Sequence, residues 1–240
     1  MPQSTCLQLK IQLAEIQDLF REFVLELGKV RETKKTGHLL ELQKEIEEKI
    51  ESLQWEFVPK EIREKIQDWQ NFYREVFGIE TDFSKIKIPE KQEGFDKLLI
   101  MAPGLDAQKI FIKCKELFQI FDTDLSSVKD LERKADSAYA IWIRDRVEAD
   151  EENSNLSADQ IEEMGMSTQT LREHLLQELE YFKKTGAHLD MQNITLCAGS
   201  RSGDGAVPRV VWGSVGDRLS VGWGISGTAG GSLRARQVVS

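Results

Sequence analysis

The sequence predicts an α+β protein, because helical and strand periodicities occupy different parts of the chain. Apolar residues recur every three or four positions in the first third, as in amphipathic helices. Short apolar runs alternate with helical segments from about residue 97, and the residues after Gly199 alternate with a period of two. With 40% hydrophobic and 30% charged residues, the composition is that of a globular chain.

Residues 1–78 are predicted to form an N-terminal antiparallel helical bundle or coiled coil. They contain apolar stripes at Leu9, Leu13, Ile16, Phe20, Phe23, Leu27 and Val30, at Leu39, Leu42, Ile46, Ile50, Leu53 and Phe57, and at Ile62, Ile66, Trp69, Tyr73 and Val76. Such helices would form a homo-oligomer or dock a partner. The alternative is an ordinary helical subdomain that covers the rest of the chain.

Residues 79–96 are expected to be a linker, and residues 97–240 a second domain of mixed strands and helices. The elements expected there are a strand at LLIM, a helix capped by Asp106, a strand over residues 138–143, a short helix from Ser157 to Glu163, and a long helix capped by Ser167 or Thr168 that ends at Gly186.

The charge and the hydropathy pattern exclude several classes of function. A net charge of -9 argues against a dedicated nucleic-acid binder, which normally carries a basic face. No apolar run approaches the length of a membrane span, and the N-terminus lacks the apolar core of a signal peptide. We therefore expect a cytoplasmic protein with no membrane or nucleic-acid partner.

No motif for a cofactor, a metal or catalysis is present. Cys6, Cys114 and Cys197 are far apart and suit small buried thiols better than a disulfide framework or a zinc site. The histidines His38, His174 and His188 match no zinc motif, so salt-bridged or exposed histidines are expected. The acidic run Glu148, Asp150, Glu151 and Glu152 lacks EF-hand spacing and is interpreted as a solvated surface.

The C-terminal tail differs in composition from the rest of the chain. Residues 199–236 hold ten of the seventeen glycines and contain no Lys, Glu, Gln or Met. Residues 199–240 carry a local charge of +3, from five arginines and two aspartates. The remaining residues therefore carry -12, so the tail is a basic and glycine-rich part of an acidic chain.

Two segments of the tail alternate as strands do. In VPRVVWG, Val210 and Trp212 share one face, and in RLSVGWG so do Leu219, Val221 and Trp223. These large apolar residues are predicted to be scaffold. The opposite positions hold Gly, Ser, Val and Arg, although a solvated strand face normally carries Thr, Lys, Glu or Gln.

The residues at these outer positions share a property of their codons. Ser, Gly, Ala, Arg, Val, Ile and Thr can all be encoded by codons that end in a pyrimidine, which never encode Lys, Glu, Gln, Met or Trp. Randomising the adenines of an AAY codon gives this set. The tail (LCAGSRSGDGAVPRVVW…LRARQVVS) thus resembles the variable proteins of diversity-generating retroelements, in which adenine-directed mutagenesis rewrites a C-terminal segment of a C-type-lectin-like domain.

The resemblance implies a C-type-lectin-like fold for residues 97–240, with a variable segment at 199–236 and LRARQVVS as the closing strand. It implies non-catalytic recognition of a protein or other ligand through a diversified face. That face would consist of Ser202, Arg209, Val211, Gly213, Ser214, Val215, Ser220, Gly222, Gly224, Ile225, Ser226 and Thr228. Arg209 would be its main anchor, because binding energy concentrates on large aromatic and arginine side chains.

Three alternatives to this interpretation remain open. The tail could be a glycine-rich meander that only completes an α+β fold. The chain could be a helical adaptor in which the first 78 residues bind the partner. It could also be an enzyme with a site near Arg144 and Asp145, which follow the strand at residues 138–143, because catalytic groups often lie at strand ends.

Overall fold

The computed structural model describes residues 15–25, 40–47, 49, 58–213 and 216–240. Ser214 and Val215 of the predicted face lie outside this part, as do Cys6 and His38. The ends of the first two predicted stripes are also outside it: Leu9, Leu13, Leu27, Val30, Leu39, Ile50, Leu53 and Phe57. The chain divides into two compact units, Met1–Gln67 and Asp68–Ser240.

The first unit is helical where it is described, in agreement with the predicted stripes. Residues 15–25 and 40–47 are helices. Lys49 Nζ lies 2.6 Å from Glu15 Oε2, which joins the end of the second helical segment to the start of the first. This ion pair is compatible with an antiparallel arrangement of the two segments.

Helix α3 (Lys60–Phe77) follows Pro59 and ends at Gly78, whose φ of 66° suits a glycine. Its C-terminal half belongs to the second unit and buries Trp69, Tyr73 and Val76, as the third stripe predicts. Residues 79–96 then form neither helix nor strand.

One sheet of the second unit has three antiparallel strands in the order β1-β3-β9. They are β1 (Lys97–Met101), β3 (Tyr139–Ile143) and β9 (Val238–Val239), and the first two are the predicted apolar strands. The free edge of β1 is covered by α3, because Trp69 Nε1 donates to Leu98 O at 2.9 Å and the Tyr73 hydroxyl donates to Ile100 O at 2.7 Å.

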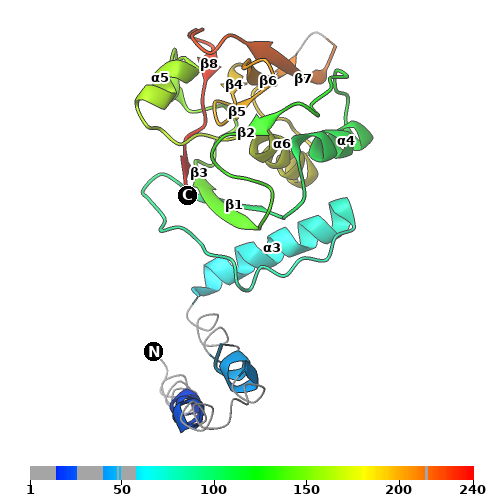
Figure 1. The fold of residues 1–240 in the computed structure, drawn as a ribbon. Coiled ribbons are helices and arrows are strands. Elements are labelled where there is room, and N and C mark those ends of the chain that lie inside the picture. Colours follow the sequence, from blue (N-terminus) through cyan, green and yellow to red (C-terminus); the bar gives the residue numbers. More distant parts are fainter. Residues whose placement is uncertain (1–14, 26–39, 48, 50–57, 214–215) are drawn as a thin grey trace. The chain divides into compact units, whose positions relative to one another are not determined.

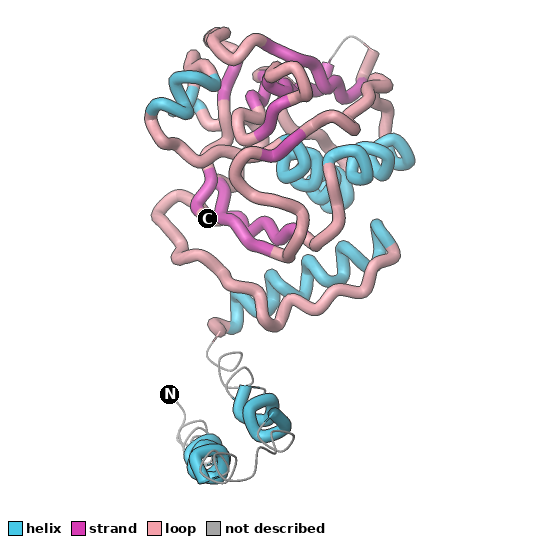
Figure 2. The backbone as a smooth tube through the Cα atoms, viewed as in Figure 1, coloured by secondary structure: helices cyan, strands magenta, loops and turns pink. Residues whose placement is uncertain are grey.

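The second sheet has four strands in the order β7-β6-β4-β8 and is built mainly from the tail. It contains β4 (Ile194–Leu196), β6 (Val207–Gly213), β7 (Arg218–Gly224) and β8 (Leu233–Arg234). A two-stranded pair, β2 (Lys129–Asp130) with β5 (Ser200–Arg201), lies between the two larger sheets in Figure 1. Figure 2 shows that long loops connect these short elements.

Four helical elements complete the second unit. They are α4 (Ala107–Leu117), the 3-10 turn η1 (Glu151–Asn153), α5 (Ala158–Glu163) and α6 (Leu171–Thr185). Asp106 caps α4 and Gly186 ends α6 with φ 70°, both as predicted. The predicted short helix from Ser157 to Glu163 is present as α5, with Ser157 as its N-cap. Helix α4 packs against α6 (Figure 1), while α5 covers part of the second sheet through Ala158 and Ile161.

The predicted cap of α6 is wrong: Thr170 caps this helix, in a capping box with Glu173. Ser167 instead bonds to Glu132, and Thr168 forms a backbone bridge with Gln237. Both of the expected residues are therefore engaged by distant segments, and the helix begins a few residues later.

The interpretation of the acidic run as a solvated surface is wrong for Asp150, which is buried. Asp150 Oδ2 accepts from Arg144 Nη1 at 2.6 Å and from the Gln237 backbone N–H at 2.8 Å. A buried carboxylate is tolerated when it is paired in this way. Glu151 and Glu152 are exposed as predicted.

Among the described residues, no helix is long and apolar enough to cross a membrane. Cys114 and Cys197 are free and buried, as predicted for small core thiols. Burial raises the pKa of both thiols, and nearby carboxylates add to this shift. Both thiols are therefore uncharged at neutral pH.

Candidate functional site

The β6–β7 hairpin separates the tail into a buried face and an outward face, as the alternation predicts. Val210 pairs with Val221 and Trp212 with Leu219, and all four side chains are buried. Directly paired residues lie on the same side of a sheet. The large apolar positions therefore form the inner face of the hairpin.

The outward face of the hairpin collects six of the predicted ligand-facing residues. Arg209 pairs with Gly222, Val211 with Ser220, and Gly213 with Arg218, while Gly224 pairs with Val207 at the end of the hairpin. Within this set, only Val207 is buried. We call the set of Arg209, Val211, Gly213, Arg218, Ser220, Gly222 and Gly224 the outward face.

The other described members of the predicted set flank this face. Ser202 lies in the turn before β6, where its backbone N–H donates to Ala206 O. Ile225, Ser226 and Thr228 lie in the loop after β7, and Ile225 is 78% exposed. The Ser226 carbonyl accepts from the backbone N–H of Asp159 in the first turn of α5, so this loop adjoins α5.

Sequence reasoning missed two members of the site. Arg218 belongs to the outward face, and the alternation that selected Ser220 could have included it. Phe121 lies beside Arg218, whose guanidinium carbon is 3.8 Å from the centre of the Phe121 ring. The backbone N–H of Phe121 donates to Leu219 O along the free edge of β7. No sequence signal links residues so far apart in the chain.

Trp223 does not behave as the buried scaffold residue that the alternation predicts, because it is 38% exposed. It lies on the inner side of β7, opposite Pro208. The segment around Phe121 and Thr123 covers the edge of β7 as far as Val221, whose carbonyl accepts from Thr123 Oγ1. Trp223 lies two residues beyond this contact and is left partly exposed.

The inner face of the hairpin is anchored to α6 through an aromatic stack. The Trp212 ring stacks on His188, with 3.3 Å between ring centroids and 7° between the planes. His188 Nδ1 lies 2.6 Å from Glu178 Oε1, and Glu178 is fully buried on α6. This contact holds β6, the strand that carries Arg209 and Val211, on its inner side.

The closing segment is held by a buried ionic network, which includes one of the predicted histidines. Arg236 Nη2 donates to Asp190 Oδ1 at 2.7 Å, and Thr195 Oγ1 donates to Asp190 Oδ2 at 2.5 Å. His174 Nε2 lies 3.3 Å from the same carboxylate. Burial lowers the pKa of His174 well below its usual value, and the charge of Arg236 lowers it further, so the ring is neutral.

The candidate enzyme residues have other roles or none in the structure. Arg144 pairs with Asp150, and its guanidinium lies 4.3 Å from the centre of the Phe95 ring. Asp145 is exposed. In the described part of the chain, no group of three His, Cys, Asp or Glu side chains could hold a metal ion.

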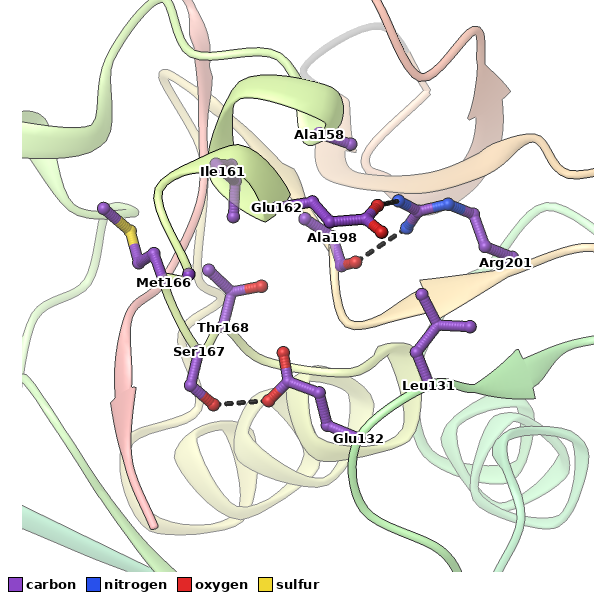
Figure 3. A pocket seen from close by; sticks show the side chains of 11 residues that line it. Leu131, Glu132, Ala158, Ile161, Glu162, Met166, Ser167, Thr168, Ala198 and Arg201 are labelled. Carbon is purple, nitrogen blue, oxygen red and sulfur yellow. Dashed lines mark hydrogen bonds and ion pairs between the residues drawn. The ribbon is translucent and has the colours of Figure 1, made fainter.

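A cavity of about 350 Å³ lies between α5, the segment of Leu131 and Glu132, and the start of the tail at Ala198 and Arg201 (Figure 3). Ile161, Met166 and Ala198 give it an apolar wall. Its charged rim groups already have partners: Arg201 Nη1 donates to Ala198 O at 2.7 Å, and Glu132 accepts from Ser167. The cavity therefore offers little charge of its own to a ligand.

Comparisons with known protein families, with curated proteins and with solved structures found no match. The site is therefore interpreted from its own geometry.

Proposed function

We propose that this protein is a non-catalytic binding protein whose outward face recognises a ligand. One observation carries the proposal: residues of the unusual small-residue set gather on one accessible face, while four large apolar residues between them are buried beneath it, namely Val210, Trp212, Leu219 and Val221. An accessible sheet face on a well-anchored hairpin is suited to recognition, because its side chains can change without loss of the core.

The contrast between the outward face and the closing segment supports a diversified face. Outward positions such as Val211 and Ser220 are partly exposed and make no buried network. Closing residues such as Leu233, Ala235 and Arg236 are buried, and Arg236 also donates to the carbonyls of Arg146 and Val147. Substitution would disturb the fold at the closing positions and spare it at the outward ones.

A C-type-lectin-like fold for residues 97–240 is part of the same proposal. Its support is that β9 pairs with β3, which also pairs with β1, so the end of the chain joins the same sheet as the first strand of this region. The tail between them forms a separate sheet that displays the outward face.

The alternatives have less support from the described residues. For an enzyme site at Arg144 and Asp145, Arg144 is already engaged in an ion pair with the buried Asp150. Asp145 would then be the one candidate catalytic group of that site. A helical adaptor would leave the unusual composition of the outward face without a role. A meander that only completes the fold would leave it unexplained as well.

The test is to sequence the DNA on both sides of the gene. We expect a near-copy of its 3′ end with AAY codons at the positions of Arg209, Val211, Ser220 and Gly222, together with a reverse transcriptase gene. The control positions are Trp212 and Leu233, whose codons should be identical in the two copies. Absence of a near-copy, with outward-face codons ending in A or G, would refute diversification.

A further inference from the structure

We propose that the outward face binds an extended acidic peptide segment of a partner protein, through Arg209 and Arg218. This inference rests on the proposed function and adds the chemical class of the ligand. It starts from the ion pairs of the arginines in the second unit.

Most arginines of this unit have a carboxylate partner within 4.0 Å: Arg74, Arg133, Arg144, Arg146, Arg172, Arg201 and Arg236. Among the described residues of the unit, Arg209, Arg218 and Arg234 have none. All three belong to the tail sheet, in β6, β7 and β8. Within the described part of this unit, the arginines without a carboxylate partner are therefore all in the sheet that builds the candidate face.

Two of the three unpaired arginines lie on the outward face. Arg209 pairs with Gly222 and Arg218 with Gly213, so both lie on the same side of the hairpin. Arg234 pairs with Thr195, which belongs to the inner side because it hydrogen-bonds to Asp190. Arg234 therefore lies on the opposite side of the sheet from Arg209 and Arg218, and it can serve as a control for them.

The two outward guanidinium groups are incompletely satisfied. Arg209 Nε and Nη2 and Arg218 Nε are buried and have no hydrogen-bond partner. A buried donor without an acceptor is unfavourable, and a charged one more so. The carboxylate of Asp217, which precedes Arg218, accepts from Trp212 Nε1 at 3.1 Å. Carboxylates from a ligand would accept from the guanidinium nitrogens that are not buried, Arg209 Nη1 and Arg218 Nη1 and Nη2, and would supply the counter-charge that both groups lack.

The spacing of the two arginines suits an extended peptide. Arg218 lies opposite Gly213, four positions along β6 from Arg209. At about 3.3 Å per residue, this separates the two backbone positions by roughly 13 Å. An extended ligand would therefore place its carboxylates about four residues apart. Gly222 leaves open space beside Arg209, because a β-carbon there would meet no atom within 4 Å.

The overall charge of the chain favours a short acidic segment over a nucleic acid. The net charge is -9, and residues 199–240 contribute +3, so residues 1–198 carry -12. A long polyanion would extend beyond the two arginines and meet this negative charge. A short peptide interacts mainly with charges within the Debye length of about 8 Å at physiological salt.

The experiment is selection from a phage-displayed library of random twelve-residue peptides on the full-length protein. A face-blocked variant, Gly222→Trp, serves to remove peptides that bind elsewhere, since its side chain projects into open space. We expect the face-dependent pool to be enriched in Asp and Glu, with pairs about four positions apart. The double charge reversal Arg209→Glu and Arg218→Glu should select Lys and Arg instead. Circular dichroism would verify that each variant is folded.

Arg234→Glu is the matched control and should leave the selected pool unchanged. For a selected peptide, Arg209→Ala and Arg218→Ala should each weaken binding by roughly tenfold, as expected for loss of a charge-assisted hydrogen bond. A face-dependent pool without acidic enrichment would overturn the charge inference and leave the proposed function standing. The absence of any face-dependent pool would overturn peptide binding, while the DNA test judges the proposed function separately.

Discussion

The guanidinium group of Arg209 lies across the backbone of Gly224, so that a β-carbon at position 224 would overlap it. The overlapping atoms are the far end of a flexible side chain, which can move aside. We therefore predict that Gly224→Ala folds and lowers the free energy of unfolding by about 1 kcal/mol or less. Urea denaturation followed by tryptophan fluorescence would measure this change.

A double-mutant cycle assigns the effect to Arg209. In the background of Arg209→Ala, the overlap is gone and Gly224→Ala should no longer be destabilising. Gly222→Ala is the matched glycine control, because a β-carbon there meets nothing within 4 Å. Equal penalties at position 224 with and without Arg209 would show that the contact is not the cause.

Local patterns predicted the two strands of the hairpin and their faces, because alternation is a property of a few neighbouring residues. Alternation over seven residues was enough to assign Val210 and Trp212 to one face and Arg209 and Val211 to the other. Caps such as Asp106 and Ser157 also act within one turn of their helix. The same reasoning could not find Phe121, whose place beside Arg218 depends on pairing between distant segments.

Helix α6 shows that the polarity of a residue does not predict its burial in the centre of this fold. Its stripe of leucines predicts one buried face, yet Glu173, His174, Glu178 and Glu180 are buried as well. Each has a partner from a distant segment, such as Arg133 for Glu173 at 2.7 Å. Burial alone would raise the pKa of Glu173, but Arg133 and hydrogen bonds lower it below its usual value. A sequence cannot show that a charged residue will be neutralised in this way.

The pair of Asp190 and Arg236 should be one of the most sensitive points of the fold. Asp190→Asn leaves the Arg236 guanidinium, which is 2% exposed, without its counter-charge. Breaking a buried pair from one side is expected to lower the free energy of unfolding by about 3–5 kcal/mol. Urea denaturation would measure the loss. Asp136→Asn, at an exposed position, should change stability by less than about 0.5 kcal/mol. A small loss at Asp190 would mean that the pair is dispensable.

We predict that His174 makes the free energy of unfolding decrease as the pH falls below about 6.5. Its pKa is lowered in the folded state by burial and by Arg236, so the unfolded chain binds a proton that the folded chain does not. Stability is then fully present above the unfolded pKa and decreases below it. Between pH 6.5 and 5.5 the free energy of unfolding should decrease by about 1 kcal/mol through this group.

The matching variant is His174→Gln, which should remove this part of the slope. Burial raises the pKa of the neighbouring Asp190, which gives a slope of opposite sign at lower pH in both proteins. Urea denaturation at several pH values between 5.5 and 7.5 would give the two curves. Identical slopes in wild type and variant would assign the pH dependence to other groups.

Tyr73 closes the edge of β1 with a single hydroxyl group. That hydroxyl donates to Ile100 O at 2.7 Å and accepts from the Ala102 backbone N–H at 3.0 Å. Tyr73→Phe keeps the ring and leaves two buried backbone groups without partners, so the free energy of unfolding should decrease by about 1–3 kcal/mol. Amide hydrogen exchange at Ala102 should accelerate. Tyr181→Phe is the control, because no hydrogen bond of its hydroxyl is found among the described residues, and a change below about 0.5 kcal/mol is expected. If Ala102 exchanges at the same rate in the Tyr73 variant, water or a neighbouring group replaces the hydroxyl, and the edge of β1 does not depend on this hydrogen bond.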